Sequence, residues 1–171
     1  MKKIFFLLIL TLVLMNSCQY EKEQSLTEDE AKLILDKLMI TMSSADTTLA
    51  VEILHPDCEL RYPLLPEPAK GIDACKQLII NTSNTFSEFK GTIKEVNIKG
   101  DRIWSRYTMS GINTGSLGQI PATGKRFQIT GMAITRIKDG KIIEDETYWN
   151  VWDFYNQLGF RLLPPNKEGE S

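Results

Sequence analysis

Few residues in this sequence have side chains suited to acid–base or nucleophilic chemistry. His55 is the only histidine and stands before Pro56 and Asp57, where a cation at the end of a helix is the simpler interpretation. Cys58 follows closely, but a thiol near a histidine without a third, orienting group is weak evidence for a nucleophile. One histidine and three cysteines also cannot build the usual four-ligand zinc site without carboxylates. The sequence therefore predicts no metal and no cofactor.

The first 17 residues are typical of an export signal. Two lysines precede an apolar run over residues 4–15, which is too short to span a bilayer because a span needs about 20 apolar residues. The serine and cysteine that follow resemble the lipobox of bacterial lipoproteins, in which the cysteine carries the lipid. We therefore expect a signal peptide over 1–17, a lipid on Cys18 that anchors the chain to a membrane, and a polar tether over 18–26. The predicted location is the bacterial cell envelope, either in the periplasm or at the cell surface. The alternative is an ordinary cleaved signal with an incidental cysteine.

Two further cysteines, Cys58 and Cys75, lie 17 positions apart. In an oxidising compartment they could form a disulfide, and spacing alone does not tell whether their Cα atoms lie within bonding range. Cys75 stands among apolar residues of an expected helix, which favours two buried free thiols.

Composition and charge indicate one globular domain that does not bind nucleic acid. The chain has 171 residues, of which 42% are hydrophobic and 25% charged, and its formal net charge is −2. It contains no dense basic run of the kind that nucleic-acid binding requires. We place the folded domain at 27–161 and a frayed tail at 162–171.

Hydrophobic periodicity divides the body into helices followed by strands. Apolar residues recur at three- and four-residue steps in the first part, and the period changes to two from about residue 89. Helices are predicted over 28–44, 47–54 and 71–81, and strands over 58–62, 92–99, 102–110, 126–137 and 141–150. Asp139-Gly140 is a strong hairpin signal between the last two strands. The pattern predicts an α+β fold in which three N-terminal helices cover one face of a curved antiparallel sheet.

Several segments between Gly100 and Gly159 carry a family resemblance. They include Gly100-Asp101-Arg102-Ile103, Ile120-Pro121-Ala122-Thr123-Gly124-Lys125-Arg126-Phe127 and Arg136-Ile137-Lys138-Asp139-Gly140-Lys141-Ile142. Together they resemble the SnoaL-like polyketide cyclase (ester cyclase) family of the nuclear transport factor 2-like superfamily. The resemblance implies a cone of helices over a strongly bent sheet.

The resemblance also implies a site. Family cyclases close a ring with an Asp on the last long strand and a His on the preceding strand, and these positions fall on Thr147 and Ala133. A further family His position falls on Asn113. Threonine and alanine have no group that titrates near neutral pH, so the family's acid–base pair is replaced in this chain.

The same alignment predicts which side chains face the cavity. We expect Asp145 to be the one acid of its strand on that face, where an apolar wall would raise its pKa and make it a replacement base. Exposed acids are common, so the other interpretation is a solvated Asp145 at the mouth of the cone. The expected pocket residues are Tyr62, Asn113, Phe127, Ile129, Gly131, Ala133, Thr135, Thr147 and Trp149. Tyr62 and Trp149 could stack on a planar ligand.

Three functions remain open at this point. The first is an exported lipoprotein that binds a small, mostly apolar molecule in the cone without catalysis. The second is a cyclase, isomerase or hydrolase of a carbonyl substrate with Asp145 as general base. The third is an interaction module that uses the outer face of the sheet and whose cavity is filled by side chains. On that face Met132, Ile134 and Tyr148 are unusually apolar, which predicts a homodimer.

Overall fold

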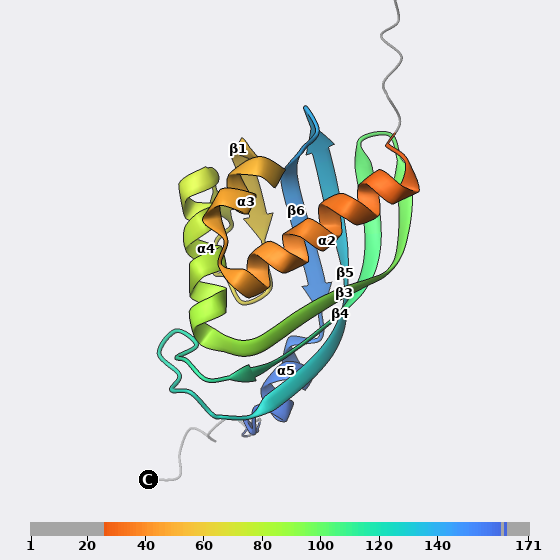
Figure 1. Ribbon diagram of the computed structural model, residues 1–171. Coiled ribbons are helices and arrows are strands. Elements are labelled where there is room, and N and C mark those ends of the chain that lie inside the picture. The colour runs from red at the N-terminus through yellow and green to blue at the C-terminus, as the bar shows by residue number, and fades with distance from the viewer. Residues whose placement is uncertain (1–25, 162, 164–171) are drawn as a thin grey trace, which may run out of the picture.

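The protein is described by a computed structural model, which places residues 26–161 and 163 (Figure 1). Four helices cover parts of a six-stranded sheet. In chain order the elements are α2 (Glu28–Ser44), α3 (Thr47–Ile53), β1 (Leu54–Arg61), β2 (Ala69–Lys70), α4 (Ile72–Thr85), β3 (Phe86–Lys99), β4 (Arg102–Asn113), β5 (Arg126–Lys138), β6 (Lys141–Trp149) and α5 (Val151–Gln157). The predicted α+β class and the cone of helices on a curved sheet are confirmed.

Local sequence signals start the helices. Thr27 caps α2 through a reciprocal capping box with Glu30, and Asp46 caps α3 by accepting from the backbone N–H groups of Thr48 and Leu49. One face of α2 is buried against the sheet, where its main contact is with β3. This amphipathic helix forms one wall of the cone.

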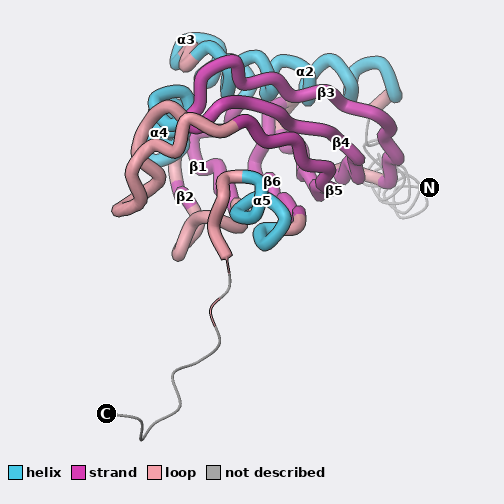
Figure 2. Tube along the Cα trace, turned by 90° about the horizontal axis from the view of Figure 1, so that it is seen from below, coloured by secondary structure: helices cyan, strands magenta, loops and turns pink. Residues whose placement is uncertain are grey.

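The sheet is antiparallel except for one pair. Its strand order is β2-β1-β6-β5-β4-β3, and β1 runs parallel to β6. Figure 2 shows how β3, β4 and β5 bend together beneath α2, with α4 beside β1. The register of β3 shifts between Ser87 and Lys90, and Glu88 adopts a left-handed φ of 50° there. Such a bulge increases the bend of a strand, which helps the sheet curl around a cavity.

Several element boundaries differ from the sequence prediction. β1 begins at Leu54 and takes in His55, so α3 ends one residue earlier than expected. α4 continues to Thr85 and β3 starts directly at Phe86, although the polar run over 82–85 has no helical hydrophobic pattern. Helix α5 was not predicted. Tertiary packing overrides weak local preference at each place.

β6 pairs with only part of β5, and helix α5 packs beside the part of β5 that β6 leaves unpaired. Asn150 caps the helix by accepting from the backbone N–H of Asp153. The side chain of Gln157 then accepts from the N–H of Gln128 at 2.7 Å and donates to its carbonyl oxygen at 2.9 Å. A side-chain amide thus continues the ladder of β5 and closes one end of the cone.

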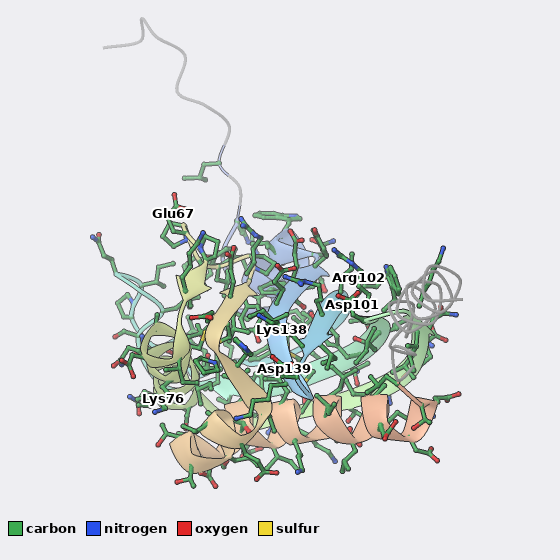
Figure 3. All side chains as sticks on the ribbon, turned by 90° about the horizontal axis from the view of Figure 1, so that it is seen from above. Glu67, Lys76, Asp101, Arg102, Lys138 and Asp139 are labelled. Atoms are coloured by element: carbon green, nitrogen blue, oxygen red, sulfur yellow. The ribbon has the colours of Figure 1, made fainter. Side chains whose placement is uncertain are left out.

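The hairpin predicted at Asp139-Gly140 is confirmed. Both residues have positive φ, 51° and 73°, as a two-residue turn with this hand of twist requires. Asp101 of the β3–β4 turn and Arg102 at the start of β4 lie at the same end of the sheet as Lys138 and Asp139 (Figure 3).

The expected signal peptide, the lipidated Cys18, most of the tether and nearly all of the tail lie outside the described residues. Among residues 26–161, no helix is long and apolar enough to cross a membrane.

Candidate functional site

A cavity of about 320 Å³ lies between the helices and the concave face of the sheet. Its wall combines apolar side chains of α2 and both apolar and polar side chains of α4 with the inward side chains of β3, β4, β5 and β6. This volume lies at the lower end of the range for small-molecule pockets. A cone filled by its own side chains, as the interaction-module hypothesis required, is not what the structure shows.

Strand register arranges the sheet side of the cavity in three rows. Side chains that face each other on neighbouring strands lie about 5 Å apart at Cβ. From β4 through β5 to β6, the rows are Ile103–Thr135–Asp145, Ser105–Ala133–Thr147 and Tyr107–Gly131–Trp149. Every oxygen-bearing side chain in these rows therefore lies either in the same row as Ala133 or in a row next to it.

Asp145 borders the cavity and is only 4% exposed. Thr135 donates a 2.6 Å hydrogen bond to its Oδ1. Burial raises the pKa of Asp145 to about 6, although the hydrogen bonds from Thr135 and Tyr62 oppose this rise by stabilising the carboxylate. The interpretation of Asp145 as a solvated acid at the mouth of the cone is wrong, because almost none of the residue is exposed to solvent.

Tyr62 follows β1 directly, beside β6, and lines the cavity. Burial and the nearby Asp145 carboxyl raise the pKa of the Tyr62 hydroxyl well above its usual value. The hydroxyl therefore keeps its proton and serves as a donor towards Asp145.

Thr147 is bound to Tyr107 from across the intervening strand. The two hydroxyls form a short hydrogen bond over Gly131, and burial raises the pKa of Tyr107 to about 12. A Cβ at Gly131 would overlap the Tyr107 hydroxyl and approach the backbone oxygen of Tyr148 at 2.8 Å. Glycine at this position is what allows the tyrosine to reach β6.

Ser105 and Ala133 lie in the middle row. Ser105 is 2% exposed and borders the cavity, and its Oγ has no hydrogen-bond partner among the described residues. Ala133 also borders the cavity and places only a methyl group beside it. Sequence reasoning missed Ser105, although the period-two pattern of 102–110 would have put it on the inward face with Ile103 and Tyr107.

Aromatic side chains close the end of the cavity near α5. Phe127 lies with its ring centroid 5.1 Å from that of Phe154 and 5.1 Å from that of Phe86, and Trp149 lies 5.2 Å from Phe154. All four line the cavity, as does Ile129. An apolar molecule would find a hydrophobic surface at this end.

Three of the expected pocket residues have other roles. Gly131 and Thr135 are buried in β5 and do not reach the cavity surface. Gly131 lies behind Tyr107, and Thr135 lies beside Asp145. Asn113 is fully buried outside the cavity lining, where its Oδ1 accepts from the Thr123 N–H at 2.9 Å and its Nδ2 donates to the Gly115 carbonyl at 2.8 Å. The prediction that Asn113 lines the pocket was wrong, because its side chain fastens the loop over 114–125.

The remaining reactive side chains lie away from the cavity. His55 lies on β1, with its ring nitrogens 3.8 Å from Asp57 and 3.8 Å from Asp139. Cys58 and Cys75 are fully buried free thiols whose sulfur atoms are 2.9 Å apart. This contact lowers the pKa of Cys58 and raises that of Cys75. No cluster of metal-ligating side chains occurs among the residues the structure describes.

The outer face of the sheet carries exposed apolar side chains beside ion pairs. Met132 is 57% exposed and Tyr148 is 52% exposed, while Arg136 pairs with Glu144 at 2.9 Å. The homodimer across this face stays a prediction.

Taken together, the fold and site define a class: a cone of helices over a curled sheet with a mostly apolar cavity and, among the described residues, one buried carboxyl at its edge. The sequence model of the SnoaL-like polyketide cyclase family matches residues 32–158 of this chain. The chain therefore belongs to that family, and the resemblance found in its sequence is confirmed.

Solved structures show the same fold at low sequence identity. TsrD from Streptomyces laurentii is 23% identical with a TM-score of 0.69, and the alignment covers 78% of this chain and 98% of TsrD. IdmH from Streptomyces antibioticus is 21% identical with a TM-score of 0.62, over 74% of this chain and 96% of IdmH. An LEH-like epoxide hydrolase from M. tuberculosis is 17% identical with a TM-score of 0.60, and the alignment covers 77% of this chain and 90% of the hydrolase. No curated protein matches the sequence significantly. These likenesses establish the fold, which is compatible with several chemistries.

Proposed function

We propose that the chain binds a small, mostly apolar molecule in the cone cavity and that Asp145 exchanges a proton with it as a general base. The observation that carries this proposal is a carboxyl group with 4% exposure at the edge of an apolar cavity. Buried carboxyls are uncommon, and one beside a pocket is a candidate for catalysis.

The chemistry follows from the pKa of about 6. At neutral pH most Asp145 side chains are ionised, and the group is still basic enough to accept a proton from a weak carbon acid. The carboxylate takes a proton from the carbon next to a ligand carbonyl, and the electron pair of the broken C–H bond moves into an enolate. The carboxylic acid then returns the proton to the enolate, at the same or at another position. Cyclases and isomerases that act on carbonyl compounds share this first step.

A second candidate is ligand binding without turnover. The resemblance supports it, because the positions of the family's acid–base pair fall on Thr147 and Ala133. In addition, the Thr147 hydroxyl already forms a hydrogen bond with Tyr107. In this alternative Asp145 is a hydrogen-bonding partner for the ligand and not a base.

The substitution Asp145→Asn separates the two candidates. It keeps the shape of the side chain and removes its basicity. The wild type would be screened for turnover and binding against a panel of small ketones and esters. A catalytic Asp145 predicts that the variant binds the same compounds and turns none over, while the matched Glu146→Gln variant on the outward face keeps both properties. Equal turnover in Asp145→Asn and the wild type would contradict the role as base, and binding by an inert wild type would favour the second candidate.

We also propose that the protein is exported and anchored through a lipid on Cys18, so that the cavity works in the bacterial cell envelope. The support is the sequence of residues 1–18 alone. Incorporation of labelled palmitate by the wild type and its loss in Cys18→Ala would support this address. A soluble, unlabelled wild-type protein would contradict it.

A further inference from the structure

The hydroxyl of Ser105 is a buried polar group whose hydrogen bonding is incomplete. Its Oγ has no partner among the described residues, although the residue is only 2% exposed and borders the cavity. Buried polar groups in native proteins are almost always paired, and an exception calls for an explanation such as a ligand. The cavity beside the hydroxyl is the place where such a ligand would lie.

The neighbours of Ser105 define the shape of this place. The register sets Ser105 opposite Ala133, and Ala133 opposite Thr147. Because alanine adds only a methyl group, room remains over Ala133 between the two hydroxyl-bearing side chains. Thr147 is already bound to Tyr107, whereas Asp145 lies one row away on the same strand as Thr147. Ser105 is therefore the free donor of this group of side chains.

The chemistry of a serine hydroxyl indicates what the ligand must supply. A serine hydroxyl carries one proton to donate, and a buried donor without an acceptor loses the hydrogen bond that it made in water, so the proton of Ser105 requires an acceptor. A second donor would leave that proton unpaired, and an apolar group would leave the whole hydroxyl unpaired. A carbonyl oxygen meets the requirement and adds no charge to the apolar cavity.

We infer that Ser105 donates a hydrogen bond to a carbonyl oxygen of the ligand and that this oxygen lies over Ala133. The ligand class is accordingly a small, mostly apolar ketone or ester. This inference rests on the proposed function, since it assumes that the cavity binds a small molecule. It assigns Ser105 as a specificity-determining residue, and it holds whether or not Asp145 acts as a base.

A pair of probes that differ by one oxygen tests the inference. The two-ring ketone 1-tetralone and the hydrocarbon tetralin have nearly the same shape, and their dissociation constants would be measured for the wild type and for Ser105→Ala. We expect the variant to bind 1-tetralone roughly three- to tenfold more weakly, the usual effect of one neutral hydrogen bond, and tetralin as tightly as before. The variant is expected to fold, because Ser105 has no protein partner to lose.

Two further measurements sharpen the result. Ser110→Ala makes the same change on the same strand, at a residue two rows along whose side chain does not line the cavity, and should leave both affinities unchanged. The infrared carbonyl band of bound 1-tetralone should lie at lower wavenumber in the wild type than in Ser105→Ala, because a hydrogen bond weakens the C=O bond.

The outcomes separate this inference from the proposed function. If Ser105→Ala binds both probes as the wild type does, or if the carbonyl band does not move, the assignment of Ser105 is overturned while binding in the cavity stands. If the wild type binds neither probe, cavity binding of this ligand class fails, and the inference fails with it.

Discussion

The hydroxyl of Thr135 donates a 2.6 Å hydrogen bond to Oδ1 of Asp145 across the β5–β6 pair. Both residues are buried, Thr135 completely and Asp145 to within 4%. The hydrogen bond stabilises the carboxylate, and the loss of water favours the neutral acid. The balance leaves the pKa near 6, in the range where a carboxyl can both accept and return a proton around neutral pH.

Stability should depend on pH through Asp145. Its pKa in the folded protein, about 6, lies above its ordinary value of 3.8, so folding favours the protonated form. The stabilisation is therefore fully present below about pH 4 and is lost as the pH rises through 6. The gap corresponds to about 3 kcal/mol. We expect the free energy of unfolding of the wild type, measured relative to Asp145→Asn by urea titration, to fall by up to this amount between pH 4 and pH 7. A constant difference between the two proteins would contradict the burial of an ionisable Asp145.

Gly131→Ala should disturb the contact between Tyr107 and Thr147. The added Cβ would meet the Tyr107 ring and the Tyr148 backbone oxygen, neither of which can move freely in a packed strand. Overpacking of this kind costs about 1–3 kcal/mol, and we expect a matching fall in thermal stability. Thr130→Ser, on the exposed face of the same strand, should change stability by no more than about 0.5 kcal/mol. An unchanged Tm for Gly131→Ala would show that Tyr107 does not cross this glycine.

The two buried thiols are placed to form a disulfide under oxidising conditions. The sulfur atoms of Cys58 and Cys75 are 2.9 Å apart, and a disulfide needs about 2.05 Å. Refolding in glutathione disulfide should oxidise both thiols to one disulfide and reduce one glutathione disulfide to two thiols. Closure of a loop between residues 17 positions apart is worth about 3 kcal/mol, so reductant should lower the Tm of the oxidised protein.

Alkylation followed by peptide mass analysis checks this bond directly. After denaturation without reductant, the Cys58 and Cys75 peptides should carry no alkyl label. The Cys75→Ser variant should show label on Cys58 and a Tm that reductant does not change. Labelling of both cysteines in the refolded wild type would count against the bond.

Asn113→Ala should weaken the loop over 114–125 and leave the cavity intact. The substitution removes the acceptor for Thr123 and the donor for Gly115, and it leaves those half-buried backbone groups without a side-chain partner. We expect a loss of about 2–4 kcal/mol in unfolding free energy, with faster hydrogen exchange at the Thr123 amide. Affinity for a cavity ligand at a temperature where the variant is folded should stay the same. Normal exchange at Thr123 would refute the fastening role.

Much of the fold could be predicted from sequence, because its signals are local. The capping box at Thr27, the period-two strands and the Asp139-Gly140 turn each depend on neighbouring residues. The inward face of β5 was also predictable, since alternation fixes it once one residue is placed. Helix α5 was missed because its anchor, Gln157 on Gln128, joins residues 29 positions apart.

The site was harder to predict because burial depends on what the rest of the chain covers. Asp145 has the same local sequence whether it is enclosed or solvated, and only the packing of α2, α4 and Tyr62 over the sheet decides the matter. The missing partner of Ser105 is likewise a property of the assembled rows. Asn113 was placed in the pocket by family alignment, but its side chain turns to the loop that follows β4.

The pKa of the Asp145 carboxyl shows whether a buried base borders the cavity. It can be measured by ¹³C NMR titration of the side-chain carbon, with Asp145→Asn to assign the signal. We predict a pKa of about 6 in the wild type and a higher value in Thr135→Val, because that variant lacks the hydrogen bond that stabilises the carboxylate. A wild-type value near 3.8, unchanged in Thr135→Val, would mean that Asp145 is solvated and would contradict a buried base in the cavity.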